Sequence, residues 1–177
     1  MREEIVTYAN RIYKLRDLIR YNNSIRIKDE SVAEHSAFVT LIVLELRRYY
    51  EFNLKKALIM AITHDLPEVY VSDVQHNVSK MFPKIKEAIT DAEKIVWEKY
   101  FGKDLGKLND EFNTGETTEG LIVQLADIIS CIQYSQSEIK LGNEGYMREV
   151  YEGSVKRMEE IMMKLDVDKI GGREDVE

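Results

Sequence analysis

Apolar residues recur at three- and four-residue spacing along most of the chain, and few helix-breaking residues interrupt the pattern. This spacing is typical of amphipathic helices, because residues three and four apart share one helix face. Only two prolines and nine glycines punctuate the sequence. The pattern predicts an all-α fold, a bundle of about six main helices over residues 5–21, 31–50, 53–66, 83–102, 121–142 and 146–165. Long loops are expected at residues 69–82 and 103–117.

Local signals at two of these boundaries place residues that could carry chemistry. Residues 31–34 read Ser-x-x-Glu, the pattern of a capping box, so His35 is expected in the first turn of the second helix. Pro67 disfavours helical geometry in the residue before it. The adjacent pair His64 and Asp65 is therefore expected in the last turn of the third helix.

Length, composition and charge narrow the class of protein. A length of 177 residues suits one domain, which we expect at residues 1–165, followed by a flexible C-terminal tail at residues 166–177. The formal net charge of -7 argues against an extended nucleic-acid surface, so no nucleic-acid polymer is expected as a partner. The first residues, MREEIV, lead into no apolar signal segment, and residues 37–46, the most apolar stretch, are shorter than the roughly 20 residues of a membrane span. These two features lead us to expect no membrane partner. Cys131 is the only cysteine and is expected in the core; a chain without an internal disulfide suits a reducing compartment, so we expect a cytoplasmic location.

Two of the three histidines fall in polar clusters on otherwise apolar helices, which suggests a metal site. Imidazole and carboxylate together suit borderline divalent ions. The second helix would run roughly 22 Å outwards from His35, and the third would return roughly 15 Å to His64. If the two helices are antiparallel, both histidines therefore lie near the same end of the pair. Asp127 lies inside the apolar segment QLADIISCI, and a buried carboxylate needs a charged partner or a metal. Taken singly, Asp127 could instead pair with an arginine, and the histidines could be ordinary core or capping residues.

The order of these residues resembles a known family. His35, then the adjacent His64 and Asp65, then the distant Asp127 match the H…HD…D metal-binding pattern of the HD-domain phosphohydrolases. The resemblance is closest to the 5′-deoxynucleotidase branch and covers about residues 5–165. It rests further on four features: Arg20 fifteen residues before His35, the surrounding segment Glu-Ser-Val-Ala-Glu-His-Ser, Glu68 and Asp73.

The resemblance implies a fold, a reaction, a cofactor and an assembly. The fold would be an HD-domain helical bundle. The reaction would be removal of the 5′-phosphate from nucleoside 5′-monophosphates, in particular deoxyribonucleotides, by attack of metal-activated water. One divalent transition metal, Co, Mn, Ni, Zn or Fe, would be held by His35, His64, Asp65 and Asp127. A homodimer is the assembly usual in this family.

The same resemblance assigns roles to residues outside the metal site. Glu68 would be the catalytic acid or base, and Arg20 would bind the phosphate. Asp73 would either contact the sugar hydroxyl or assist catalysis. Tyr21 stands where the bacterial enzyme carries tryptophan, and the Asp73 to His76 loop lacks that enzyme's proline and threonine. Selection of deoxyribose therefore stays open, and His76 is expected at the edge of the substrate site.

Two other functions remain open on sequence grounds. The chain could be a different HD-domain enzyme, acting on alarmones or cyclic nucleotides, because such enzymes share the metal site. It could also be a non-catalytic helical oligomer in which the metal only holds the fold together. In that second case Glu68 would be a solvated loop carboxylate and Arg20 a charge that complements a helix C-terminus.

Overall fold

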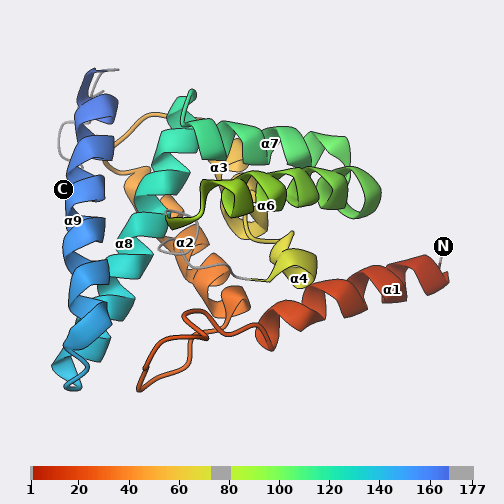
Figure 1. The fold of residues 1–177 in the computed structure, drawn as a ribbon. Helices are drawn as coiled ribbons and strands as arrows, with labels where there is room; N and C mark the ends of the chain where they lie inside the picture. The colour runs from red at the N-terminus through yellow and green to blue at the C-terminus, as the bar shows by residue number, and fades with distance from the viewer. Residues whose placement is uncertain (1, 73–80, 168–177) are drawn as a thin grey trace.

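The structure, a computed structural model, describes residues 2–72 and 81–167 and consists of helices joined by loops (Figure 1). The predicted all-α class is confirmed: within the described ranges, the one extended pairing is an isolated antiparallel bridge between Ile19 and Ser31. The elements are α1 (Arg2–Tyr13), η1 (Lys14–Arg16), α2 (Val32–Leu46), α3 (Leu54–Thr63), α4 (Glu68–Val71), α6 (Pro83–Val96), η2 (Trp97–Phe101), α7 (Lys103–Thr114), α8 (Thr118–Lys140) and α9 (Gly145–Val167).

Helix α8 forms the centre of the bundle, between α9 on one side and α2, α3 and α7 on the other (Figure 1). Residues 121–126 of α8 are all buried, which is the burial expected of a helix surrounded by neighbours rather than of one lying on a surface. The main core joins α8 to side chains of α2, α3 and α9, among them Val39, Val43, Met60 and Ile161. A second apolar cluster forms around Val32, Leu66 and Trp97 and includes side chains of α4 and η2.

Local sequence signals account for several helix ends. Ser31 caps α2 and forms the full capping box with Glu34, as predicted. Asn53 caps α3 by accepting a hydrogen bond from the Lys56 N–H. Gly102 has a φ of 98°, a conformation that L side chains rarely adopt, and it separates η2 from α7.

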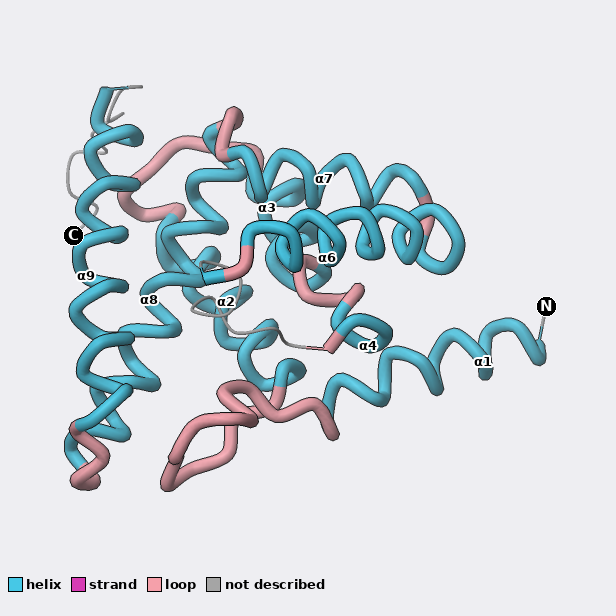
Figure 2. Tube along the Cα trace, viewed as in Figure 1, coloured by secondary structure: helices cyan, strands magenta, loops and turns pink. Residues whose placement is uncertain are grey.

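The predicted first helix, over residues 5–21, is wrong at its C-terminal end. Helix α1 ends at Tyr13, and after the η1 turn residues 17–31 form a loop (Figure 2). Backbone hydrogen bonds from Arg20 N–H to Glu30 O, 2.9 Å, and from Val32 N–H to Leu18 O, 2.9 Å, close this loop at its base. Leu15 is buried in the second cluster, so its apolar character reflects tertiary packing rather than continued helix.

The loops predicted at residues 103–117 and 69–82 also contain helix. Helix α7 covers most of the first segment, and its Leu108 and Phe112 pack against the main core. Helix α4 occupies the start of the second segment. The structure describes no residues from 73 to 80. Helix α9 continues two residues past the predicted end at residue 165, and the rest of the predicted tail lies outside the described residues.

Candidate metal centre

Three helices bring the predicted metal ligands to one place. His35 lies in the first turn of α2, His64 is the C-cap of α3, and Asp127 lies in the middle of α8. One ligand atom from each of these residues lies within 4.8 Å of the others, so the three could hold a metal ion. Asp65 joins them: its Oδ2 is 3.1 Å from His64 Nε2 and 3.7 Å from His35 Nε2.

The His64 ring is oriented for metal binding. Its Nδ1 lies 2.7 Å from the carbonyl oxygen of Ala61, and since a carbonyl only accepts, Nδ1 carries the proton and donates it. Its Nε2 is fully buried and, in the described structure, makes no hydrogen bond, although the Asp65 carboxylate lies nearby. A buried polar atom without a hydrogen bond is costly. A cation between His64 and the carboxylates would satisfy this atom, so the residues present fit a metal ion.

The His35 ring is held by three groups. Its Nε2 lies 3.1 Å from Asp127 Oδ1, and its Nδ1 lies 3.0 Å from Ser130 Oγ and 2.7 Å from the Arg20 guanidinium. A guanidinium only donates, so in this structure His35 Nδ1 accepts from Arg20 and the ring proton lies on Nε2, towards Asp127 Oδ1. A ring that binds a metal through Nε2 must instead carry its proton on Nδ1, where Ser130 can accept it and Arg20 cannot. Ser130 is therefore the neighbour that suits the tautomer with Nε2 free for a metal.

The imidazoles of the site are buried, whereas its carboxylates are partly exposed to solvent. The side chains of His35 and His64 are 1% and 2% exposed, whereas those of Asp65 and Asp127 are 19% and 26% exposed. The carboxylates therefore mark the direction from which water and a substrate can approach. Catalytic metal sites keep an open coordination position whereas structural sites are closed, and the partly exposed carboxylates agree with the open kind.

The charged groups of the site shift one another's pKa values. Burial and the positive charge of Arg20 lower the pKa of His35 below its ordinary value. Burial also opposes the charge of His64, but the carboxylates of Asp65 and Asp127 outweigh it and raise the pKa of His64 to about 9. Burial would raise the pKa of Asp127, yet its hydrogen bond and its positive neighbours hold that pKa well below the ordinary range. The carboxylates are thus charged and ready to attract a cation at neutral pH.

Arg20 and Tyr21 lie beside the centre, on the loop of residues 17–31. Arg20 donates to Glu30 at 2.8 Å and to the Cys131 sulfur at 3.4 Å, and its side chain is 14% exposed. Tyr21 is 8% exposed, and its ring stacks on Tyr134 with centroids 5.1 Å apart and planes at 2°. The structure thus places the Arg20 guanidinium beside the candidate metal ligand His35, 2.7 Å from its Nδ1.

Glu68 begins α4, directly after the bend that follows the His64 and Asp65 pair. The residue as a whole is half-buried, with its Oε2 atom buried, and it lines a pocket of about 300 Å³ together with Ser72, Lys86, Ile89, Thr90, Glu93 and Asn113. Asp73 and His76, the other two predicted substrate or catalytic residues, lie outside the described residues.

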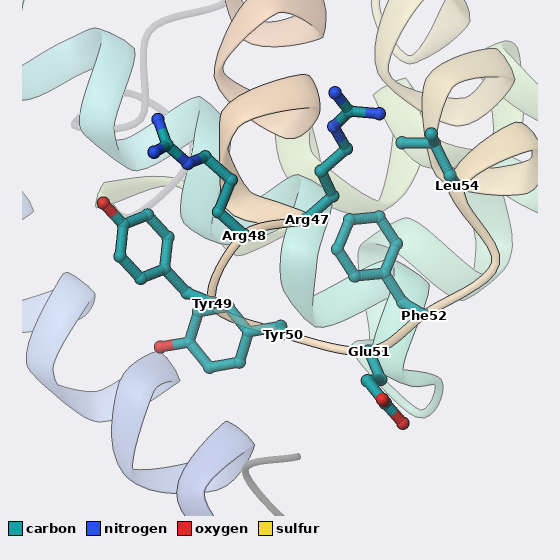
Figure 3. A pocket seen from close by; sticks show the side chains of 7 residues that line it. All are labelled: Arg47, Arg48, Tyr49, Tyr50, Glu51, Phe52 and Leu54. Carbon is teal, nitrogen blue, oxygen red and sulfur yellow. The ribbon is translucent and has the colours of Figure 1, made fainter. Parts of the chain in front are cut away.

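A second pocket, of about 360 Å³, lies where α2 connects to α3 (Figure 3). Residues 47–52 and Leu54 line it, with Arg47, Arg48 and Tyr49 among them. His35 is at the opposite end of α2, and a helix of 15 residues spans roughly 22 Å. None of the candidate metal ligands contributes to this pocket, so volume alone does not identify the functional site.

Sequence reasoning missed Ser130 and Glu30, the partners of His35 and Arg20. Ser130 could have been found, because it follows Asp127 by three residues on the same helix and must share its face. Glu30 had no such signal, since only the closing of the loop brings it beside Arg20. Cys131, expected simply in the core, also contacts Arg20 and lies 3.8 Å from Asp127 Oδ1.

The helical bundle and the H…HD…D residues together define an HD-domain protein. Comparison with families confirms this assignment: a family model described as 5′-deoxynucleotidase YfbR-like matches residues 7–169. The chain therefore belongs to the YfbR-like 5′-deoxynucleotidase family. No match is found among curated proteins.

Solved structures with similar folds come from archaea and bacteria. The PH0347 protein from Pyrococcus horikoshii OT3 is 27% identical with a TM-score of 0.74, over 93% of this chain and 95% of that chain. A conserved hypothetical protein from Pyrococcus furiosus is 28% identical with a TM-score of 0.71, over 88% of this chain and 90% of that chain. An HD-domain phosphohydrolase from Listeria innocua shares the fold, with 23% identity and a TM-score of 0.75, over 91% of this chain and 82% of that chain.

Proposed function

We propose that this protein is a metal-dependent phosphohydrolase that removes the 5′-phosphate from nucleoside 5′-monophosphates, with deoxyribonucleotides as the preferred class. The observation that carries the proposal is the meeting of one ligand atom each from His35, His64 and Asp127 within 4.8 Å, with Asp65 Oδ2 3.1 Å from the buried His64 Nε2. The position of Arg20 supports a phosphate ligand, because its guanidinium lies beside the candidate ligand His35 and guanidinium groups bind phosphate well.

The proposed cofactor is one divalent transition metal, Co, Mn, Ni, Zn or Fe, held by His35, His64, Asp65 and Asp127. A divalent ion supplies Lewis-acid chemistry, because it lowers the pKa of water and neutralises charge on phosphoryl oxygens. Two imidazoles with two carboxylates suit each of these metals, so the donor set supports the class of ion rather than one element.

The protein residues would divide the remaining work. Glu68, which begins α4 beside the His64 and Asp65 pair, is the proposed acid or base that takes a proton from the attacking water or gives one to the leaving oxygen. Arg20 would orient the phosphate and stabilise its charge as the bond to the leaving group breaks. Asp73 keeps its two proposed roles, contact with the sugar hydroxyl or assistance in catalysis, and His76 is proposed at the edge of the substrate site.

Tyr21 is the proposed wall of the sugar site. Its ring is buried, stacks on Tyr134, and lies with its centroid 5.3 Å from the Arg20 guanidinium carbon. A ring fixed in this way next to the phosphate-binding group can exclude bulk by shape. We therefore propose that Tyr21 contributes to preference for deoxyribose, in the way the tryptophan of the bacterial enzyme does.

The test is phosphate release from matched deoxyribo- and ribonucleoside 5′-monophosphates, with Mn, Co, Zn and Mg added separately to metal-stripped protein. We expect release that depends on a transition metal and is faster for the deoxyribonucleotides. Arg20→Ala should weaken activity on every nucleotide, since phosphate is common to all of them. If no 5′-monophosphate is hydrolysed with any metal, the proposal fails, and cyclic nucleotides and alarmones become the next substrates to try.

We further propose a homodimer in the cytoplasm. Helix α1 has no buried residue, carries the exposed apolar residues Ile5, Val6 and Tyr8, and extends beyond the body of the bundle (Figure 1). A helix of 12 residues is marginal alone in water, so contact with a second copy would stabilise it. Light scattering should give twice the mass of the chain, and Ile5→Glu should shift it towards the monomer. In the described ranges, no helix is both long and apolar enough to cross a membrane.

A further inference from the structure

The loop that carries Arg20 is fixed at its base and again at its tip. At the base, the Ile19 to Ser31 bridge and the Arg20 N–H bond to Glu30 O hold the two ends together. Loops of this length are usually mobile unless side chains tie them down. The groups that hold the tip therefore decide how well Arg20 is oriented.

The tip is held by the C-terminal part of α8. Glu138 accepts hydrogen bonds from the backbone N–H groups of Ile27, at 2.7 Å, and Lys28, at 2.8 Å. The Tyr134 hydroxyl donates to the Lys28 carbonyl oxygen at 2.7 Å. Asn143 donates to Glu138 Oε2 and to the Ile25 carbonyl oxygen, each at 2.8 Å.

Glu138 is an unusual residue for a purely structural contact. It is 0% exposed, and burying a carboxylate is costly unless donors surround it. Here three N–H groups point at it, two of them from the loop backbone. Hydrogen bonds to a charged acceptor are stronger than neutral ones, so Glu138 is suited to fix a backbone in one conformation.

The same part of α8 also holds Tyr21, the neighbour of Arg20. Tyr21 has a φ of 55°, which is rare for a residue with a side chain, and such a conformation persists only where its surroundings enforce it. Its stacking on Tyr134 supplies that constraint. Tyr134 therefore contacts both Tyr21, the positive-φ residue directly after Arg20, and the loop tip, through the hydrogen bond from its hydroxyl to Lys28 O.

We propose that Glu138 and Tyr134 are positioning residues for Arg20: they hold the loop of residues 17–31 so that the guanidinium stays beside the metal centre. This inference rests on the proposed function, because it gives Arg20 the role of binding phosphate. Neither residue touches the candidate metal ligands in the contacts described above. Both would act through the loop backbone.

The experiment is a double-mutant cycle. Glu138→Gln, Tyr134→Phe and Arg20→Ala are made singly, and each of the first two is combined with Arg20→Ala. We expect Glu138→Gln to raise KM for the best nucleotide about tenfold, the effect of losing roughly one charge-assisted hydrogen bond, with metal affinity unchanged. Tyr134→Phe keeps the stacking and should raise KM by a smaller factor. In the Arg20→Ala background neither change should have a further effect.

Glu119→Gln is the matched control. Glu119 is another glutamate of α8 that accepts a hydrogen bond from a backbone N–H, that of Asn53, at 2.9 Å. Its loss should leave KM as in the wild type. If Glu138→Gln raises KM by the same factor with and without Arg20, the residue supports the fold in general, and the positioning inference is wrong.

Binding of inorganic phosphate to the manganese-loaded protein is measured on the same variants, so the cycle does not depend on turnover. If the wild type hydrolyses no nucleotide, the proposed function fails, while a non-additive loss of phosphate affinity would still support the positioning of Arg20. A wild type that binds no phosphate would overturn the inference itself.

Discussion

Replacing Ser130 with alanine tests whether His35 is a metal ligand with a fixed tautomer. Ser130 Oγ lies 3.0 Å from His35 Nδ1, and it is the acceptor that can take the Nδ1 proton when Nε2 binds a metal. Arg20, the other group at Nδ1, only donates. Ser130→Ala would leave a buried N–H facing a donor, and we therefore expect weaker metal binding.

The magnitude follows from burial. Ser130 is 1% exposed, so solvent does not readily replace its hydroxyl. A buried donor left unsatisfied costs about 1–3 kcal/mol, and loss of such outer partners typically weakens metal binding about 10- to 100-fold. The energy cost and the loss of metal affinity agree, since a tenfold change in affinity corresponds to about 1.4 kcal/mol. We expect the dissociation constant for zinc or cobalt to rise by about 10- to 100-fold.

The assay is competition with a chromophoric chelator near neutral pH. Ser135→Ala is the matched control: Ser135 is also on α8, is 0% exposed, and donates only along its own helix, to the carbonyl oxygen of Cys131 at 2.7 Å. Both changes remove one buried hydroxyl from the same helix. If the affinities of the two variants agree within about twofold, Ser130 does not orient a metal ligand, and the assignment of His35 loses its support.

Three further predictions follow from the site and its supports. Glu68→Gln should lower kcat by at least about 100-fold and leave metal content unchanged, measured by phosphate release and elemental analysis; retained turnover would remove Glu68 from the reaction. Adding manganese at about 100 times its dissociation constant to metal-stripped protein should stabilise it by about 2.7 kcal/mol in urea unfolding, whereas an unchanged midpoint would argue against a site in the folded state. Burial alone would raise the pKa of Glu138, but its three N–H donors outweigh burial and lower the pKa, so its contribution to stability is present above the unfolded carboxyl value and disappears as the pH falls through the folded value. The wild type should therefore lose more stability than Glu138→Gln as the pH falls from about 7 to about 3 in urea unfolding, and equal losses would refute this role.

Much of the metal centre follows from local rules that sequence expresses directly. The capping box fixes the start of α2 and hence the position of His35 one turn inside it. The short connection between α2 and α3 makes them neighbours, and the rings of His35 and His64 lie with centroids 5.4 Å apart, as the length estimate requires. Asp127 is recognisable because a carboxylate in an apolar helix needs compensation.

The elements that sequence failed to predict depend on tertiary contacts. Helix α7 contains Gly106 and several Asn and Asp residues, which have low helix propensity, and it is stabilised by burying Leu108 and Phe112 against the core. The reverse holds for residues 17–21. Their apolar spacing continues that of α1, yet backbone hydrogen bonds from Arg20 N–H to Glu30 O and from Val32 N–H to Leu18 O hold them as a loop. The spacing of apolar residues indicates which side chains are buried. It does not determine whether the backbone that carries them is a helix or a loop.

One face of α8 connects the metal centre to the loop that carries Arg20. The stripe consists of Asp127, Ser130, Cys131, Tyr134 and Glu138. Ser130 and Cys131 lie three and four residues after Asp127, and Tyr134 and Glu138 continue the same spacing, so all five share one face of the helix. The first contacts His35, the next two contact His35 and Arg20, and the last two hold the loop tip and Tyr21. Because the helix is rigid, the distance between the candidate metal ligands and Arg20 is set along this stripe. Substitutions near Asp127 should change metal affinity, those near Glu138 should change KM, and those at Cys131, between the two, should change both.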